Sequence, residues 1–447
     1  MSVPSETPMQ LVALAESILQ QTRNISQYLK DHEHAEMTFD SVYSEPPNDP
    51  EFVQLQDSLK TSLEDLRFLA DGPTRFYRSF FMTGYLLAAF QLVLDLRFFD
   101  LVPSDGAISF EELAEKAGLD ADRTKRVVCY LATHHVFRVA QPGLVSHTAF
   151  SIAMRDEELR SVVHYSFDEM LKAAVETGTS LKATPYESDK THCPFAARHG
   201  VPIFEYYAKH TDKALRFAKA MAAYRRSKAI SPQHNIPPTL KYYGSLTINP
   251  EVENSTVELK DNFSWNRLEG TVVDIGGGSG HISMALARDF PNLKFVVQDD
   301  SEDMLSDGQR LLTPDIQDRI AFQKQSFFAP QPCRDVAAFV IRQCTHNWAD
   351  DGVIVMFKSV VPGLEGSSPD TPLLINDIVM PEAGTIPRLK ERAMREADMV
   401  MMVSFGAKQR TKAEFGVLLK KADPRFVIRK VHDTGALGLL EVYLDRS

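Results

Sequence analysis

Cysteine is scarce in this sequence, and the few cysteines stand far apart. The chain has four of them, with no CxxC pair and no His/Cys cluster: Cys129, Cys193, Cys333 and Cys344. A disulfide framework or a structural zinc site needs closely spaced ligands, so the sequence argues against both and predicts no metal site. Scattered thiols are typical of a reducing compartment, and we expect a cytoplasmic protein.

Long apolar runs and an excess of positive charge are also missing. No stretch approaches the ~18 uninterrupted apolar residues of a membrane span. The N-terminus has no basic region followed by an apolar block. The most apolar segment, residues 80–102, contains Asp95, Arg97 and Asp100, which predicts a buried helix instead of a span. A formal net charge of −11 argues against a nucleic-acid or anionic-membrane partner.

The 447 residues are enough for two or three domains. Residues 8–30 have the apolar spacing of an amphipathic helix, a proline-rich break follows at 44–52, and a second helix is expected over about 52–70. We divide the chain into an N-terminal helical extension, a winged-helix-like domain, a further helical region and a C-terminal α/β domain, at residues 1–70, 71–160, 161–245 and 246–447.

Residues 108–148 follow a winged helix-turn-helix pattern. Ser109 can cap a short helix that Gly118 ends, Asp120 can cap the next helix, and "FRVA" and "GLVSHT" predict a two-stranded wing. Such a module either packs and dimerises or binds DNA. The acidic charge of the chain argues against DNA binding.

From residue 270 onward the pattern changes to short β-rich runs that alternate with helical stretches. The runs are "TVVDI", "KFVVQD", "VAAFVI", "PLLINDIV", "FVIRKV" and "LLEVYL". This alternation predicts a Rossmann-like α/β domain with a mostly parallel sheet. The polar, proline-bearing segment before it, residues 227–267, is expected to be a linker or surface excursion.

A glycine turn directly follows the first of these strands. The segment "TVVDIGGGSG" places Gly276, Gly277, Gly278 and Gly280 between a β-branched run and the helical "HISMALARDF". A strand, a glycine turn and a helix N-terminus together are typical of a nucleotide-type site. A dinucleotide fingerprint would need a third glycine where His281 stands, and a P-loop would need a GK[ST] ending that is absent.

The acidic residues around this turn favour S-adenosylmethionine, a ligand without phosphate. Asp274 precedes the glycines and is placed to help hold the ammonium group. Asp299 ends the second strand, where a carboxylate can accept both ribose hydroxyls.

His346 differs from the other histidines by its position. It follows the apolar strand "VAAFVI" and precedes an Asp-rich helix start, which puts it at the carboxyl edge of the sheet, where ligands of such sheets bind. A neutral imidazole there can take a proton from a hydroxyl group.

Two motifs together carry a family resemblance that covers most of the chain. "VVDIGGGSGHISMALARDFPNLKFVVQD" and the later "IRQCTHNWADD" are similar to the caffeic-acid-type class of S-adenosylmethionine-dependent O-methyltransferases, in the version common among fungal secondary-metabolite enzymes. The resemblance implies an S-adenosylmethionine-binding domain at 246–447, dimerisation through the helical N-terminal regions, and a homodimer.

The resemblance also assigns roles to single residues. His346, in the family's H-[ND]-W motif, would be the catalytic base, flanked by Asp377 and by Gln409, which stands where the family commonly has glutamate. Gln409 can form hydrogen bonds but cannot stabilise an imidazolium ion by charge. The implied cofactor contacts are Asp274, Gly276, Gly277, Gly278, Asp299, Ser326 (where the family usually has aspartate), Phe327 and Arg342; the implied substrate contacts are Asp398, Met399 and Met402.

Three functions follow from these patterns. The first is methyl transfer from S-adenosylmethionine to a hydroxyl, expected to be phenolic, of a small secondary metabolite such as a polyketide. The second is a pericyclic reaction or dehydration in which the same cofactor serves only as a fixed positive charge. The third is a non-catalytic regulator that uses the winged helix, against which the intact glycine turn, Asp299 and His346 argue.

Overall fold

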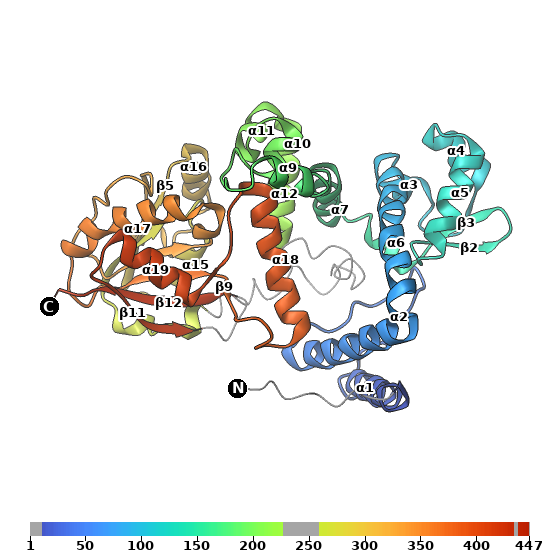
Figure 1. Cartoon of the computed structure of the whole chain (residues 1–447), viewed down its shortest axis with the longest axis horizontal. Helices are drawn as coiled ribbons and strands as arrows, with labels where there is room; N and C mark the ends of the chain where they lie inside the picture. Colours follow the sequence, from blue (N-terminus) through green and yellow to red (C-terminus); the bar gives the residue numbers. More distant parts are fainter. Residues whose placement is uncertain (1–10, 227–258, 433–436, 447) are drawn as a thin grey trace. The chain divides into compact units, whose positions relative to one another are not determined.

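The computed structural model describes residues 11–226, 259–432 and 437–446 (Figure 1). The chain divides into two compact units. The first comprises residues 1–167 and 215–244, and the second comprises residues 168–214 and 245–447. Each unit is described by itself.

Two long helices open the first unit. They are α1 (Leu11–Asp31) and α2 (Pro50–Asp95), and they pack on each other through Ile25, Leu29 and Phe52. Asp49 caps α2 by accepting a hydrogen bond from the amide of Phe52 at 2.9 Å, so the helix begins within the predicted proline-rich break, with Pro50 in its first turn. Helix α2 runs on where the sequence predicted two helices, and it kinks at Gly72.

The apolar segment at 80–102 is helical as predicted, but the prediction that it is buried is wrong for its first half. Val93 and Leu94 lie in the core, whereas Phe80, Phe81 and Tyr85 are 65%, 64% and 64% exposed. Leu86 and Phe90 of the same helix are nevertheless packed, Leu86 at 8% exposed and Phe90 against the rings of Phe99 and Phe167. An exposed apolar surface of this kind on a folded chain is typical of a binding interface.

The rest of the first unit is a small α/β module. It contains α3 (Phe98–Leu101), β1 (Ile108–Ser109), α4 (Phe110–Ala117), α5 (Ala121–Ala132), β2 (Phe137–Gln141), β3 (Leu144–His147), α6 (Ala149–Ala153) and α7 (Glu157–Tyr165). The predicted caps are confirmed: Ser109 and Asp120 accept the amides of Glu112 and Arg123, at 3.1 and 3.0 Å. Gly118 ends α4 with φ of 67°.

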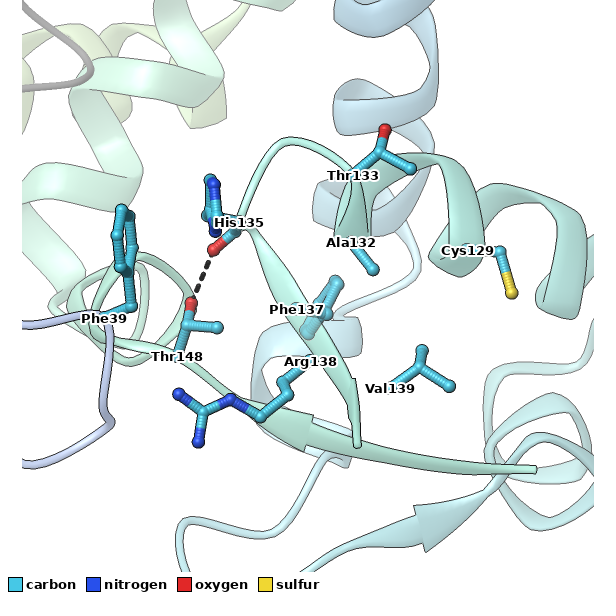
Figure 2. Close-up of a pocket in the computed structure, with 9 residues that line it drawn as sticks. All are labelled: Phe39, Cys129, Ala132, Thr133, His135, Phe137, Arg138, Val139 and Thr148. Carbon is cyan, nitrogen blue, oxygen red and sulfur yellow. Dashed lines mark hydrogen bonds between the residues drawn. The ribbon is translucent and has the colours of Figure 1, made fainter. Parts of the chain in front are cut away.

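The predicted pair of strands is present, and β1 adds a third strand in the order β1-β3-β2. A pocket of about 340 Å³ lies beside α5 and β2 (Figure 2). Its lining includes Phe39, His135 and Arg138, and none of the site residues expected from the sequence. Thr148 closes one side by donating a hydrogen bond from its hydroxyl to the carbonyl of His135 at 2.7 Å.

The second unit begins with a helical region and continues into the sheet domain. The helices are η1 (Ser166–Leu171, a π-helix that crosses the boundary), α8 (Lys172–Ala174), α9 (Thr177–Ala183), α10 (Pro194–His199), α11 (Ile203–Lys209) and α12 (Thr211–Arg226), whose last turns belong to the first unit. The linker predicted at 227–267 lies largely outside the described residues. Its end contains α-helical Leu259 and the 3₁₀ turn η2 (Trp265–Arg267).

A seven-stranded sheet forms the centre of the second unit, in the order β11-β12-β8-β7-β4-β5-β6. The strands are β4 (Gly270–Ile275), β5 (Leu293–Asp299), β6 (Ile320–Lys324), β7 (Ala338–Arg342), β8 (Leu373–Asp377), β11 (Phe426–His432) and β12 (Gly438–Leu444). The first five pair in parallel, and β12 is antiparallel to both neighbours. The predicted Rossmann-like sheet is confirmed, and the sequence analysis missed β6.

Successive apolar residues of the strands point to opposite faces of this sheet, and each face packs into a hydrophobic core. Val273 and Phe339 face a core formed with α17 (Asp350–Glu365) and α19 (Lys412–Ala422). Val272 and Val340 face a second core that includes α15 (His281–Asp289) and Trp265. The remaining elements are α16 (Glu302–Leu311), η3 (Gln317–Arg319), η4 (Thr345–Asn347), β9 (Val379–Met380), α18 (Arg388–Phe405) and β10 (Arg410–Thr411). Among the described residues, no helix is both long and apolar enough to cross a bilayer.

Candidate active site

The strand order places a ligand crevice between β4 and β7. The chain proceeds from β4 outward through β5 to β6, then returns to form β7 on the other side of β4. In open α/β sheets ligands bind at the carboxyl ends of the strands where this reversal occurs. The glycine turn follows β4, and the turn that carries His346 follows β7, so both lie at this point.

The glycine turn is packed tightly against its neighbours. Gly276 has φ of +71°, and a Cβ built there would lie 2.8 Å from the sulfur of Cys344. A Cβ on Gly277 would lie 2.6 Å from the carboxyl carbon of Asp274. Side chains at these positions would therefore collide with Cys344 and Asp274, so the turn needs glycine to pack this closely.

The amide groups of this turn are used within the protein. Gly276 and Gly277 both donate to the carbonyl of Gln298, at 2.8 and 3.0 Å, and Gly278 donates to Asp299 Oδ2 at 3.0 Å. A phosphate-binding turn directs such N–H groups at its anion. Their use here fits a ligand that has no phosphate at this place, as S-adenosylmethionine does.

The two acidic residues of the predicted cofactor site lie on either side of the turn. Asp299, at the end of β5, accepts Gly278 through one oxygen and the amide of Ser301 through the other, at 2.9 Å. Each carboxylate oxygen has a second lone pair for a ribose hydroxyl. Asp274 is 4% exposed and accepts a 2.7 Å hydrogen bond from Ser283. Burial raises the pKa of Asp274, and Ser283 and Arg342 oppose this rise.

Aromatic rings line the next part of the crevice. Phe327 lies against Gly276, and its ring packs edge-on to those of Phe328 and Trp348, with centroids 4.7 and 5.7 Å away. Ser326 is half-buried and accepts the amide of Phe328 at 3.4 Å. Arg342 ends β7 and donates to the side chain of Gln343 at 2.8 Å. These positions agree with a cofactor crevice, and the contacts of Ser326, Phe327 and Arg342 with the cofactor stay predictions.

The structure brings His346 and Asp377 together. The Nδ1 atom of His346 lies 2.5 Å from Asp377 Oδ1. An ionised carboxylate only accepts hydrogen bonds, so Nδ1 carries the proton and Nε2 has the free lone pair. The Asp377 side chain is 2% exposed and that of His346 15% exposed, so Asp377 is enclosed while the histidine ring retains access to solvent.

Asp377 remains a carboxylate in spite of its burial. Desolvation by burial raises its pKa, but the charge and hydrogen bond of His346, together with hydrogen bonds from Thr345 and from the amide of Ile378, lower it below its usual value. The hydroxyl of Thr345 donates to Asp377 Oδ2 at 2.6 Å, and the Ile378 amide donates to Oδ1 at 3.0 Å. A fixed negative charge therefore stands behind the imidazole ring.

Gln409 is not hydrogen-bonded to His346 in the described part of the chain. It lies in the loop before β10, is 5% exposed, and its backbone amide donates to Asp398 Oδ1 at 2.7 Å. Its side-chain oxygen is buried without a hydrogen-bond partner. The structure thus joins the backbone of Gln409 to Asp398, and the flanking role of its side chain beside His346 stays a prediction.

The three expected substrate residues lie on α18, and their side chains differ in exposure. Met399 is 50% exposed, whereas Asp398 and Met402 are half-buried. One oxygen of Asp398 is already used by Gln409. Contact of these side chains with a substrate stays a prediction.

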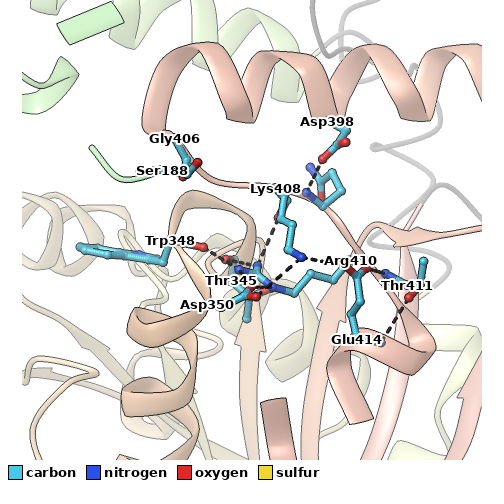
Figure 3. Close-up of polar contacts among 11 residues, drawn as sticks. Ser188, Thr345, Trp348, Asp350, Asp398, Gly406, Lys408, Arg410, Thr411 and Glu414 are labelled. Atoms are coloured by element: carbon cyan, nitrogen blue, oxygen red, sulfur yellow. Dashed lines mark hydrogen bonds and ion pairs between the residues drawn. The ribbon is translucent and has the colours of Figure 1, made fainter. Parts of the chain in front are cut away.

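Sequence reasoning missed Thr345 and Arg410. Thr345 precedes the histidine and binds its carboxylate partner. Arg410 is fully buried and binds the backbone on both sides of the histidine (Figure 3). Thr345 directly precedes the H-[ND]-W motif, so its position in the sequence could have indicated a role. Arg410 is far from the motif in sequence, and only the fold brings it to the histidine turn.

Comparison with known proteins identifies the family. The model of the O-methyltransferase domain matches residues 251–424, and the model of the O-methyltransferase dimerisation domain matches residues 80–154. The chain is 48% identical to the O-methyltransferase sol2 of Alternaria solani over 99% of this chain and 97% of that protein.

Solved structures agree on the fold. The mitomycin 7-O-methyltransferase MmcR has a TM-score of 0.63 at 18% identity, covering 85% of this chain and 99% of its own. A pericyclic reaction enzyme has a TM-score of 0.65 at 18% identity, covering 97% of this chain and 100% of its own. At such identities the likeness shows the fold alone. With sol2 similar along almost the whole chain, and both domain models matched, the chain belongs to the S-adenosylmethionine-dependent O-methyltransferases of the fungal secondary-metabolite type.

Proposed function

We propose that this methyltransferase acts on a phenolic hydroxyl of a small secondary metabolite such as a polyketide, with His346 as general base. The observation that carries the proposal is the 2.5 Å hydrogen bond between His346 Nδ1 and Asp377 Oδ1. It leaves Nε2 as the basic nitrogen at the carboxyl edge of the sheet. Asp377 orients the ring and stabilises the imidazolium ion that forms when Nε2 takes the phenolic proton.

The cofactor crevice follows from the same edge. S-adenosylmethionine supplies, when bound, an electrophilic methyl group on a positively charged sulfur. We assign its ribose to Asp299 and its ammonium group to the neighbourhood of Asp274, with the backbone of Gly276–Gly278 along it. Phe327, Ser326 and Arg342 complete the crevice as predicted cofactor contacts.

We assign the acceptor pocket to α18, in which Met399 and Met402 would contact an aromatic ring. Methionine is flexible and polarisable, and it makes favourable contacts with aromatic rings of varied shape. Asp398 has a second carboxylate oxygen that can accept a substrate hydroxyl.

We further propose that the enzyme is a cytoplasmic homodimer. Four free cysteines agree with a reducing compartment. The exposed Phe80, Phe81 and Tyr85 of α2 begin where the matched dimerisation domain begins, and a second copy of the chain would cover them. We interpret residues 71–160 as a winged-helix-like module within this dimerisation region. Sedimentation of the purified protein as a monomer at micromolar concentration would contradict the dimer.

The pericyclic or dehydrating alternative rests on a single observation, the uncharged and unpartnered side-chain oxygen of Gln409. A pericyclic reaction needs no proton acceptor beside the sulfur, whereas a dehydration still needs a base to take the proton that leaves with the hydroxyl group. Incubation with methyl-labelled S-adenosylmethionine and a panel of phenols separates the two functions. Labelled product with release of S-adenosylhomocysteine supports methyl transfer, whereas substrate conversion without cofactor consumption supports the alternative.

A matched pair of variants tests the role of the histidine. We expect His346→Ala to lower kcat by about 10²-fold or more, because general-base catalysis contributes on that order. The control is His432→Ala, which also removes a buried histidine–carboxylate pair, here with Glu441 at 2.9 Å on the antiparallel edge. The control should keep kcat. A His346→Ala enzyme whose kcat is as high as that of the His432→Ala control would refute the general-base role.

A further inference from the structure

Arg410 is a charged side chain with no access to solvent. Its side chain is 0% exposed. Burying a guanidinium group costs several kcal/mol unless its hydrogen-bonding groups are satisfied. A residue kept in this position therefore needs acceptors for all five of its N–H groups.

The five N–H groups all have acceptors. Nε and Nη2 donate to Asp350 Oδ1 at 3.1 and 2.8 Å. Nη1 donates to the carbonyls of Thr345 and Lys408, at 2.9 and 3.2 Å. Nη2 also donates to the carbonyl of Trp348 at 2.7 Å (Figure 3).

Two of these acceptors lie on either side of the histidine. Thr345 precedes His346 directly, and Trp348 follows it by two residues, so the guanidinium group spans the turn from one end to the other. Asp350, the third acceptor, begins α17, to which the turn leads. Arg410 thus binds the histidine turn at its entry and at its exit.

Thr345 links the hydrogen bonds of Arg410 to Asp377, the carboxylate behind the histidine. Its carbonyl accepts from Arg410, and its hydroxyl donates to Asp377 Oδ2 at 2.6 Å. The other oxygen of Asp377 holds the imidazole ring. The backbone of the turn is held by Arg410 while Asp377 holds its side chains.

The segment that carries Arg410 is itself fixed to α18. Asp398 of α18 accepts the amide of Gln409, directly before Arg410, at 2.7 Å. Lys408 adds an ion pair to Asp350 at 3.6 Å (Figure 3). A chain of contacts therefore runs from α18 through Arg410 to the histidine turn.

We propose that Arg410 is a positioning residue for methyl transfer, which holds the Thr345–Trp348 turn so that His346 stays on Asp377 with Nε2 facing the acceptor. The proposal rests on the proposed function of His346 as base. It gives Arg410 no contact with substrate or cofactor. It also explains why arginine is needed, since lysine has three donors on one atom and cannot reach both carbonyls and the carboxylate in a fixed plane.

The test compares Arg410→Lys with Arg319→Lys. Arg319 is a matched control because it also donates to main-chain carbonyls of the same unit, those of Phe290, Leu293 and Asp315. We expect Arg410→Lys to lower kcat by about 10- to 100-fold, as a misplaced catalytic group does. The Kd of S-adenosylmethionine, measured by calorimetry, should stay within about 2-fold, since Arg410 acts on a different turn. Arg319→Lys should change neither.

A second measurement separates positioning from a loss of folding. In ¹⁵N NMR spectra of the imidazole ring, the wild type should show His346 with the proton on Nδ1. Arg410→Lys should show a mixture of tautomers at a temperature where circular dichroism reports a folded protein. In a double-mutant cycle with Asp377→Asn, the two losses of kcat should be less than additive, because both act through the same ring.

The outcomes are distinct. An unchanged kcat in folded Arg410→Lys, or additive losses in the cycle, would overturn the positioning role. If His346→Ala keeps full activity, the general-base proposal fails first, and with it the reason for positioning. Loss of activity in His346→Ala but not in Arg410→Lys refutes only the inference about Arg410.

Discussion

The change of Asp377 to asparagine isolates the charge behind His346, the proposed general base. Asparagine has the same shape, and its oxygen can replace Oδ1, which accepts His346 Nδ1 at 2.5 Å and the Ile378 amide at 3.0 Å. Its NH₂ group then faces the hydroxyl of Thr345, which can turn to accept instead of donate. The substitution therefore preserves the hydrogen bonds and removes the negative charge.

The expected loss follows from the energy of that charge. A hydrogen bond to a charged group contributes about 1.5–3 kcal/mol, against about 1 kcal/mol for a neutral pair. Two unit charges ~4 Å apart at an effective dielectric constant of ~20 attract by about 4 kcal/mol, which bounds the effect from above. Since each 1.36 kcal/mol is a factor of ten in rate, the difference of about 0.5–2 kcal/mol lowers kcat by roughly 2- to 30-fold, and the upper bound by roughly 10³-fold.

The assay is the rate of label transfer at saturating cofactor and acceptor. We expect the Kd of S-adenosylmethionine to stay unchanged, because Asp377 touches the histidine turn and not the glycine turn. The control is Glu441→Gln, which removes the charge of the carboxylate paired with His432 and should leave kcat as it is. A folded Asp377→Asn enzyme whose kcat equals that of the wild type would refute the reasoning.

The same substitution has a pH signature in stability. The pKa of Asp377 is lower in the folded protein than its usual value, through the donors around it. Its stabilising contribution is therefore present above the unfolded pKa of ~3.9 and is lost as the pH falls through the folded value. The Tm difference between wild type and Asp377→Asn should shrink as the pH falls from ~6 toward ~3. A difference that grows on acidification would show that the carboxylate is not stabilised as described.

Two further predictions concern the cofactor crevice. Burial raises the pKa of Asp274, so the unliganded wild type should lose stability as the pH rises from ~3.9 through the pKa of Asp274 in the folded protein. Asp274→Asn should therefore raise the Tm of the unliganded protein at neutral pH, measured by scanning calorimetry. The same variant should weaken S-adenosylmethionine binding, measured by titration calorimetry. A lower Tm for the variant at pH 7 would contradict this. Gly276→Ala should lower Tm and cofactor affinity, because its Cβ would meet the sulfur of Cys344 at φ of +71°. Gly143→Ala, at φ of +81° in open space, should lower the free energy of unfolding by the backbone cost of about 1–2 kcal/mol, and with it Tm, but leave affinity intact.

Local signals in the sequence predicted the local structure well. Ser109 and Asp120 cap their helices because capping depends on residues within one turn. The β-branched runs became strands of the sheet, with "TVVDI" as β4. Strand β6, "IAFQK", was missed because only part of it is apolar and it lies at the edge of the sheet.

Features that depend on long-range contacts were not predictable. Phe80 and Phe81 belong to an apolar segment, and composition alone cannot tell a core from an interface. Arg410 could not be recognised from the sequence, since its acceptors other than the Lys408 carbonyl are 60 or more residues away along the chain. His346 and Asp377 were placed by the family motif, and their 2.5 Å contact depends on neighbouring parallel strands.

The sheet holds both turns of the site by the same physical device. On one side of the crevice, Asp299 at the end of β5 accepts the amide of Gly278, in the turn after the neighbouring β4. On the other side, Asp377 at the end of β8 accepts Thr345 and His346, in the turn after the neighbouring β7. In each case an outer strand ends in a carboxylate that fixes the turn of an inner strand. Because β4 and β7 pair with each other in parallel, the turns that follow them lie at the same edge of the sheet, and the register of this pair sets their relative position.

The turn assigned to the methyl donor and the turn of the proposed base are fixed by separate carboxylates, and they touch where Cys344 Sγ donates to the carbonyl of Gly276 at 3.7 Å. Asp299 accepts from Gly278 and Ser301, whereas Asp377 accepts from Thr345, His346 and Ile378, which follow β7 and β8. The paired β4 and β7 are the common frame, and their central residues Val273 and Phe339 are fully buried. The alignment should therefore tolerate substitutions on the outer strands better than any change of register between β4 and β7, because a rigid sheet transmits such a shift to both turns at once.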